Sequence, residues 1–416
     1  MNETVVITGF GGITACGHTI EDSWRAIKAK ESGVASMESW DASEWTYAKA
    51  AEIKNADPRT MLQDKKLLKV ISTQDVYGIY AATAAVTHSG IPSQCERTGI
   101  FVASPGNKFQ QQYDFLPLFA KAQGDMKVFA ENLFSQVHPT WLLKILPNNV
   151  LAYVGIQYGF KGANENITNH AISGLQAVIE AANAIADGLI DRAVVVGYDI
   201  GPEPQGVVYY GEIGTLSATA VKSFDRQADG TILGEGAGAI VLESKTSALA
   251  RQATIYGEIL AGSSTSEAQG IFSLASDGEG LSRAIQNSLD TAKLTPRDVG
   301  MCTAHANGNP KSDSSEAFAL RDIFAKQALP VTGFKWAIGH TLAAAGVLET
   351  IFTLLALRER SVPGIATLHE LSSESADLSV SSEAQVPLSS IGLVNARSFG
   401  SMNAALLLKA TVDHHV

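Results

Sequence analysis

The chain has 416 residues, 45% of them hydrophobic and 18% charged, which is enough to fill a sizeable core in two or three domains or in one duplicated domain. The net charge of −11 and the absence of a Lys/Arg cluster argue against a nucleic-acid-binding protein. The three cysteines form no Cys-x-x-Cys pair, which argues against a disulfide framework and against a zinc site.

The start of the chain and its apolar runs indicate a cytoplasmic protein. The opening residues, MNETVVITGFGG, lack the basic and long apolar regions of a signal peptide. The longest apolar run, 342–357, is interrupted by Glu349 and is too short to span a bilayer. We therefore expect no membrane segment and no metal ion. An acidic partner, such as a carrier protein, would need a local basic patch on this acidic chain.

Short β-rich runs alternate with helical runs in the first half of the chain. These runs are apolar on both faces, which is typical of buried strands that helices cover on both sides. Strands are predicted at 4–10, 98–104, 192–198 and 236–244, and helices at 73–90 and 174–190. The segment 104–150 is irregular and aromatic, and we interpret it as an insertion that packs over a site or a partner.

The second half repeats this order of elements without a clear sequence repeat. Strands are predicted at 253–264 and 299–309, helices at 281–294, 313–324 and 339–357, and a β-hairpin at 390–410. The sequence therefore predicts a duplicated α/β protein whose halves are residues 1–250, with the insertion, and 251–416.

Two glycine clusters do not predict a dinucleotide site. Gly9, Gly11 and Gly12 follow a predicted strand, but Thr14 stands where the third glycine of G-x-G-x-x-G would fall. The second cluster, 234–239, precedes a strand rather than a helix. Both clusters are interpreted as tight turns.

A set of polar residues at strand-to-helix junctions is the stronger signal. His305 lies at a strand end in a polar loop, and His340 lies where a helix is expected to open, shortly after Lys335. Two imidazoles at such junctions can donate hydrogen bonds to a developing oxyanion. A helix N-terminus lowers the pKa of a nearby histidine and keeps it neutral. Lys335 and Glu316 are expected to form a supporting ion pair. Each residue alone is more readily explained as a satisfied buried polar group, and it is their combination that indicates a site.

At these residues the chain resembles the β-ketoacyl-[acyl carrier protein] synthases, condensing enzymes of the thiolase superfamily. The resemblance covers nearly the whole length and implies the thiolase-like, duplicated α-β-α-β-α five-layered fold. It also implies that no cofactor is needed, because the substrates are carried on the phosphopantetheine of acyl carrier protein. The segments that carry it are VVITGFGGITACGHTIEDSWRAIKAKESGV, FDRQADGTILGEGAGAIVLES, AHANGNPKSDSSEA, KWAIGHTLAAAG and SFGSMNAALLL.

The resemblance assigns roles to five of these residues. His305 and His340 match the two histidines that bind the malonyl thioester and aid its decarboxylation. Lys335 and Glu316 match the ion pair behind them. Phe399, on the closing glycine-rich turn, matches the residue that gates the acyl pocket.

The chain departs from the family at the nucleophile. The family's cysteine lies in a Thr-Ala-Cys-Ala-Ser-Gly-like turn, and the aligned position here is Ala171. Cys16 and Cys302 do not match that position, and no base is placed for Ser173. Losing a covalent nucleophile costs on the order of a millionfold in rate, so this chain alone should not perform condensation.

Other flanking positions depart as well. The first histidine loop reads His-Ala-Asn-Gly-Asn, where the family prefers His-Gly-Thr-Gly-Thr. In the last turn, Ser398, Ser401 and Met402 replace common Gly, Gly and Thr. His170, beside the empty position, is expected to line the cavity or to pack there. The residues expected at the acyl pocket are His170, Phe399, Gly400, Phe109, Tyr113 and Phe115.

Four interpretations fit this pattern. The preferred one is the non-catalytic chain-length-factor subunit of a type II polyketide synthase, which pairs with an active ketosynthase, serves carrier-bound polyketide or polyene chains and limits their length. The second is an active synthase with an engineered cysteine-to-alanine change at Ala171, although the unusual His170 argues against a simple knockout. The third is a malonyl-carrier decarboxylase that uses His305 and His340, and the fourth is a scaffold that docks acyl carrier protein.

Overall fold

The computed structural model describes residues 3–106, 115–199, 201–324 and 327–411. The strands are β1 (Val5–Thr14), β2 (Val34–Ser36), β3 (Lys49–Ala51), β4 (Thr98–Ala103), β5 (Asn164–Ile167), β6 (Arg192–Tyr198), β7 (Gly236–Ser244), β8 (Gly257–Ser266), β9 (Met301–Thr303), β10 (Pro330–Thr332), β11 (Ser379–Val380), β12 (Ile391–Ser398) and β13 (Met402–Ala410). The α-helices are α1 (Ile20–Lys28), α2 (Pro58–Met61), α3 (Thr73–Ser89), α4 (Leu116–Ala122), α5 (Met126–Gln136), α6 (Trp141–Ile145), α7 (Asn149–Tyr158), α8 (Ser173–Ala186), α9 (Pro204–Glu212), α10 (Lys245–Ala250), α11 (Glu279–Ala292), α12 (Pro310–Phe324), α13 (Lys335–Ile338) and α14 (Ala345–Arg358). Short 3₁₀-helices are η1 (Lys65–Lys69), η3 (His170–Ile172), η4 (Pro296–Asp298), η5 (Leu342–Ala344) and η6 (Ser373–Ser375).

The long sheet consists of two copies of a five-strand arrangement joined at their edges, with β11 added beyond β10. Its order is β11-β10-β9-β12-β13-β8-β1-β7-β6-β4-β5. In the first half β1, β7 and β6 pair antiparallel, and β6, β4 and β5 pair parallel. In the second half β8, β13 and β12 repeat the antiparallel pairs, and β12, β9 and β10 repeat the parallel ones. A short β1–β8 pairing joins the copies.

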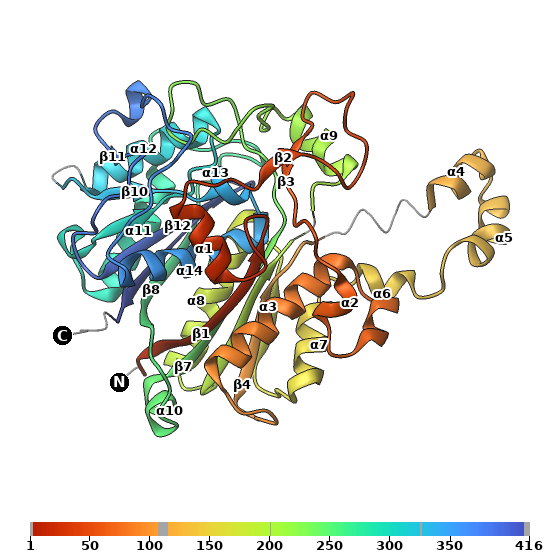
Figure 1. Cartoon of the computed structure of the whole chain (residues 1–416), viewed down its shortest axis with the longest axis horizontal. Coiled ribbons are helices and arrows are strands. Elements are labelled where there is room, and N and C mark those ends of the chain that lie inside the picture. Colours follow the sequence, from red (N-terminus) through yellow and green to blue (C-terminus); the bar gives the residue numbers. More distant parts are fainter. Residues whose placement is uncertain (1–2, 107–114, 200, 325–326, 412–416) are drawn as a thin grey trace.

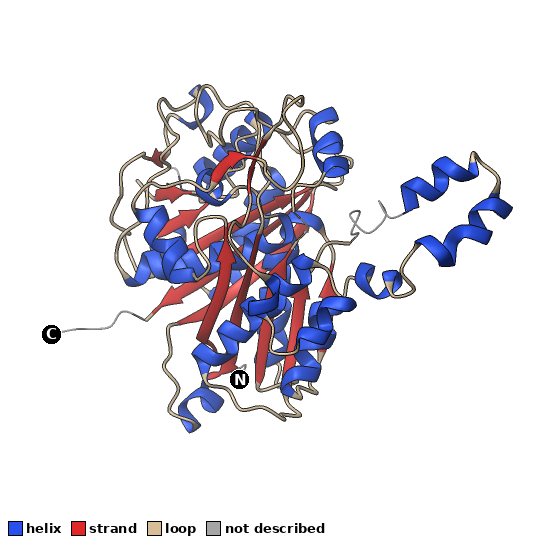
Figure 2. Cartoon of the chain, turned by 45° about the vertical axis from the view of Figure 1, so that its right-hand side comes forward, coloured by secondary structure: helices blue, strands red, loops and turns tan. Residues whose placement is uncertain are grey.

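Helices separate and cover the two halves of the sheet (Figures 1 and 2). α3 packs on β1, β7 and β6 at one outer face, and α11 packs on β8 and β13 at the other. α8 and α14 lie between the halves, where they contact each other and strands of both halves. The duplicated thiolase-like five-layered α/β fold predicted from the sequence is thus confirmed.

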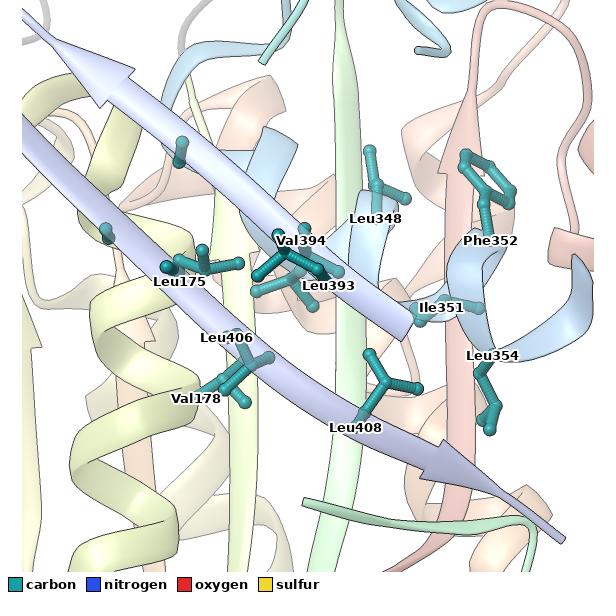
Figure 3. Close-up of a cluster of buried hydrophobic side chains, with 14 of the residues drawn as sticks. Leu175, Val178, Leu348, Ile351, Phe352, Leu354, Leu393, Val394, Leu406 and Leu408 are labelled. Carbon is teal, nitrogen blue, oxygen red and sulfur yellow. The ribbon is translucent and has the colours of Figure 1, made fainter. Parts of the chain in front are cut away.

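The middle layer holds much of the hydrophobic core. Figure 3 shows Leu175 and Val178 of α8 close to the hairpin strands β12 and β13, and Ile351 of α14 beside the start of β12. Burial of apolar surface is the main source of stability, so this layer fixes the position of both central helices. The N-terminal ends of these helices are the parts that position the site.

The two central helices approach closely at a pair of glycines. A Cβ atom at Gly174 would lie 2.6 Å from the backbone oxygen of Ala343, and one at Gly346 would lie 2.4 Å from the backbone nitrogen of Leu175. Neither backbone atom can move aside as a side chain could. The small residues therefore allow the starts of α8 and α14 to meet.

Several predicted elements differ from the structure in their bounds, among them the strand predicted at 299–309, of which only Met301–Thr303 forms β9. The predicted helix 339–357 is interrupted, because α13 ends at Ile338, Gly339 has a φ of 68°, and α14 begins only at Ala345. His340 therefore precedes a 3₁₀ turn and does not open the helix. The predicted helix at 313–324 begins at Pro310, a residue that is favoured in a first helical turn. The hairpin at 390–410 is confirmed by the antiparallel pairing of β12 and β13.

The insertion that reads as irregular is helical where it is described. α4 and α5 form an arm that extends from the body of the molecule (Figure 2). Short-range aromatic packing explains this arm, because the ring of Phe115 lies 4.8 Å from Trp141 and 6.5 Å from Phe129. None of the helices in the described ranges combines the length and apolar character that crossing a membrane requires.

Candidate active site

The turn before α8 has the geometry of a tight strand-to-helix elbow. β5 ends at Ile167, η3 follows, and His170 adopts a φ of 55°, a left-handed conformation that is uncommon outside glycine. The backbone N–H of Asn169 donates to the Ser173 hydroxyl at 2.7 Å. Ala171 is 1% exposed, so its methyl group is enclosed at the start of the central helix.

The two predicted histidines lie side by side, and His340 lies just before η5, which packs against η3 at this elbow. The ring centroids of His305 and His340 are 5.3 Å apart, and their planes cross at 75°. Both residues are buried. Nδ1 of His340 accepts a 3.2 Å hydrogen bond from the backbone N–H of Leu342. In a neutral imidazole the proton then resides on Nε2, which is the tautomer that donates a hydrogen bond from Nε2.

Burial holds the pKa of both histidines well below the usual range, and the Lys335 ammonium group lowers the two pKa values further. Burial is the main cause of these low pKa values, whereas the sequence predicts that a helix N-terminus lowers them. Two neutral imidazoles in a dry site can stabilise negative charge that develops on a substrate oxygen.

The predicted ion pair between Lys335 and Glu316 is wrong. The Nζ atom of Lys335 donates to Glu349 at 2.5 Å and to the backbone oxygen of His305 at 2.6 Å. Both side chains of the Lys335–Glu349 pair are 1% exposed. Glu349 comes from α14, and a single carboxylate inside a buried apolar run is the sequence signal that could have identified it.

Glu316 supports the first histidine loop through the backbone. Its two carboxylate oxygens accept from the N–H groups of His305 and Ala306 at 2.8 and 2.9 Å. The backbone of Ala306 has a φ of 44°, so the loop needs such bonds to hold its shape. Glu316 and Lys335 therefore both position His305, through different atoms and without pairing with each other.

His170 and Phe399 meet at the mouth of the elbow. Their rings stack with centroids 4.7 Å apart and planes at 23°. Nε2 of His170 lies 2.8 Å from the Tyr210 hydroxyl, and Nδ1 lies 3.3 Å from the Ser398 hydroxyl. Burial lowers the pKa of His170 to about 4, so the ring is neutral near neutral pH.

The available thiols are not placed to act as nucleophiles. Burial raises the pKa of the Cys16 thiol to about 11, and that thiol donates to the backbone oxygen of Ala337. Burial, followed by the Glu316 carboxylate, raises the pKa of Cys302 well above its usual range. A thiol reacts as the thiolate, so both groups are poorly reactive. The described residues contain no group of three or more His, Cys, Asp or Glu side chains that could hold a metal ion.

The predicted pocket residues are not all brought together. Phe399, Gly400 and His170 lie at the elbow, but Phe115 packs within the insertion. Phe109 and Tyr113 lie outside the described residues.

Sequence reasoning did not identify Tyr210 or Asp199, whose carboxylate accepts from the backbone N–H of Ala343 at 2.8 Å. Nothing in their local sequence indicates these long-range contacts.

Comparisons with known proteins agree with this geometry. Residues 2–248 match the N-terminal domain model of β-ketoacyl synthases, and residues 256–369 match the C-terminal domain model. The chain is 30% identical to a 3-oxoacyl-[acyl-carrier-protein] synthase 2 of Coxiella burnetii, over 98% of this chain and 99% of that protein. It is 29% identical to a 3-oxoacyl-[acyl-carrier-protein] synthase 2 of Staphylococcus aureus, over 98% of both proteins.

Solved structures give the same fold. The ishigamide ketosynthase/chain length factor aligns with a TM-score of 0.89 at 24% identity, over 99% of this chain and 100% of that chain. A β-ketoacyl synthase from Burkholderia phymatum aligns with a TM-score of 0.87 at 24% identity, over 98% of this chain and 100% of that chain. Together the comparisons support ketosynthase-type condensation in fatty-acid or polyketide synthesis as the chemistry around which this site is built. The chain belongs to the β-ketoacyl synthase family.

Proposed function

We propose that this chain is the condensation-silent, chain-length-factor subunit of a heterodimeric ketosynthase. The observation that carries the proposal is Ala171 at the aligned nucleophile position, in an otherwise well-built site. A buried histidine pair and its supporting carboxylates are retained, whereas the group that would hold the acyl chain is missing. In this role the partner supplies the cysteine, and this chain contributes half of the assembly and limits product length.

A strand at the edge of the sheet and an exposed apolar arm support a partner subunit. β5 is the last strand of the sheet order and pairs with β4 on its inner side. Unpaired strand edges are sites where another chain can add. The arm formed by α4 and α5 carries large apolar side chains that are 54–65% exposed and that a partner could cover. They are Leu116, Phe119 and Met126.

A basic face supports an acidic carrier protein as the second partner. We define this face as Arg59, Lys65, Lys66, Lys69 and Lys144. Arg59 and Lys144 line a cavity of about 410 Å³ that Leu68 also borders. Two carboxylates, Asp57 and Asp64, lie in the same segment, residues 57–69. Basic side chains outnumber acidic ones in this segment, although the whole chain has a net charge of −11. One of the solved structures with this fold is a type II polyketide acyl-carrier protein in complex with its ketosynthase.

The first test is the native mass of the assembly recovered from its own host with the tagged chain as bait. We expect a one-to-one complex with a second ketosynthase chain that has cysteine at the nucleophile position. A homodimer of this chain would overturn the proposal. Phe119→Asp with Met126→Asp should reduce recovery of the partner. The matched control is Leu249→Asp, which changes a side chain 60% exposed on α10, outside the arm, and should have no effect.

Malonyl-carrier decarboxylation is a second candidate, favoured by the neutral His305–His340 pair. Such an activity would release carbon dioxide from a malonyl thioester without a cysteine and would disappear in His340→Ala. If the unmodified chain releases carbon dioxide and the His340→Ala variant releases it equally well, this assignment is contradicted. The interpretation of an engineered alanine gains no support from the elbow, because His170 and Ser398 also depart from the family there.

A further inference from the structure

Four aromatic rings cluster around Phe399 at the elbow. Phe272 is 64% exposed and packs edge-on against Phe399 at 5.2 Å. Phe399 stacks on His170 at 4.7 Å, and Tyr210 lies 5.9 Å from Phe399 and 6.0 Å from His170. Ala171, which follows His170 in the chain, is 1% exposed.

Polar contacts join the Phe399 turn to the loop that carries Phe272. The backbone N–H of Gly400 donates to the oxygen of Ile271 at 2.7 Å, which ties the Phe399 turn to the loop that carries Phe272. The Ser401 hydroxyl reaches the backbone oxygens of Gly270 and Ser273 at 2.7 and 2.8 Å. The Phe399 turn is therefore held in place by the neighbouring loop.

His170 is fixed from three sides. Tyr210 lies at Nε2, Ser398 at Nδ1, and Phe399 covers one ring face. Moving the ring aside would break a hydrogen bond and a stacking contact together. Because His170 directly precedes position 171, an acyl chain attached there would lie next to this fixed ring.

We propose that His170 is a specificity-determining residue that excludes acyl chains from this elbow, so that a cysteine at position 171 alone would not be acylated. This inference rests on the proposed function to the extent that Ala171 occupies the nucleophile position. It implies that the site is silenced twice, by the missing thiol and by the ring beside it. Restoring the thiol by Ala171→Cys is then not sufficient to recover an acyl-enzyme.

The test uses the purified full chain and octanoyl-pantetheine. In the reaction the introduced thiol attacks the thioester carbonyl, a new carbon–sulfur bond forms, and pantetheine leaves as the thiol. Acylation at position 171 is followed by peptide mass, because Cys16, Cys95 and Cys302 remain in the chain. We expect Ala171→Cys with His170→Gly to be acylated about thirtyfold faster than Ala171→Cys alone, which corresponds to the loss of one hydrogen bond and one ring contact.

Glycine is chosen because His170 has a φ of 55°, a conformation that glycine adopts without strain. Ala171→Cys with His170→Ala serves as a second variant, and thermal unfolding shows that each variant is folded. Equal acylation of the single and double variants, or acylation of neither folded variant, would overturn the inference.

The chain offers a matched control in His88. Its Nε2 lies 2.8 Å from the Tyr256 hydroxyl, and its ring packs edge-on against Phe10 at 4.6 Å. His88 thus makes the same kinds of contact as His170, but at an exposed position on α3. Ala171→Cys with His88→Ala should react as slowly as Ala171→Cys alone. This assay needs no partner subunit, so its failure is distinguishable from a failed native-mass experiment.

Discussion

Lys335 is a buried cation whose partner is defined by geometry. Removing one member of a buried ion pair leaves an uncompensated charge and costs about 3–5 kcal/mol. We therefore expect Lys335→Met to be strongly destabilising and Lys335→Met with Glu349→Leu to recover much of the loss. In urea denaturation the coupling energy of Lys335 with Glu349 should exceed about 2 kcal/mol. The coupling energy of Lys335→Met with Glu316→Gln should stay below about 1 kcal/mol. A larger coupling energy with Glu316 than with Glu349 would show that Lys335 pairs with Glu316 instead.

His170 makes the stability of the chain sensitive to acid. Its folded pKa of about 4 lies below the ordinary value of 6.5, so the unfolded chain binds the proton more readily between these values. The neutral ring makes its full contribution to the free energy of unfolding above pH 6.5. This contribution is lost as the pH falls towards 4. Between about pH 7.5 and about pH 5 this loss amounts to about 2 kcal/mol.

His170→Gly should therefore reduce the acid-induced loss of stability, which denaturant unfolding at both pH values measures. The loss should not vanish, because burial also lowers the pKa values of His305 and His340. An unchanged pH dependence in His170→Gly would show that the ring is not buried as a neutral group.

At the scale of elements, the crossing of α8 and α14 depends on the absence of two Cβ atoms. In a helix interior Gly→Ala ordinarily stabilises by about 0.5–1 kcal/mol. We expect the opposite for Gly346→Ala, because its Cβ would lie 2.4 Å from the backbone nitrogen of Leu175. A loss of about 2–4 kcal/mol in thermal unfolding is the expected outcome, typical of overpacking that forces backbone shifts.

The matched control for this crossing is Gly155→Ala in α7. Its Cβ would meet the Ile100 Cδ1 atom at 3.2 Å, the flexible end of a side chain that can adjust. This variant should be neutral or slightly stabilising. Equal effects of both substitutions would show that helix propensity, rather than the crossing, determines the result.

The elements differ in how far local sequence predicts them. The strands at 98–104 and 192–198 are found almost to the residue, because runs apolar on both faces describe buried strands locally. The helix at 339–357 is only partly predicted, since its apolar pattern continues through the break at Gly339. The helical character of the insertion is missed because its aromatic residues pack on one another rather than along a periodic stripe.

The site is predicted in its residue types more than in its pairings. His305 and His340 can be found because each follows a recognisable run, and their packing in the structure agrees. The partner of Lys335 is not predicted, since Glu316 and Glu349 are both available and sequence spacing does not distinguish them. The contact of His170 with Tyr210 joins residues 40 positions apart, and no local pattern encodes it.

At the scale of the whole molecule, charge is distributed unevenly. The chain has a net charge of −11, yet η1 presents Lys65, Lys66 and Lys69 to solvent beside the cavity that Arg59 and Lys144 line. An acidic carrier protein that approaches this chain is repelled by its net negative charge and attracted by this face. Complementary charge of this kind mainly sets the rate and orientation of encounter and is screened by salt.

Lys65→Glu with Lys66→Glu should therefore weaken binding of acyl carrier protein to the intact complex by about tenfold at low ionic strength, with a smaller effect at high salt. Fluorescence anisotropy of a labelled carrier at two salt concentrations measures the dissociation constant. The matched control is Lys293→Glu with Lys409→Glu, which makes the same change of charge at two exposed lysines of the second half. If both pairs weaken binding equally, the effect comes from net charge and the basic face is not the docking surface. If only the first pair weakens it and salt removes the difference, the carrier is received at the face formed by η1, α2 and α6.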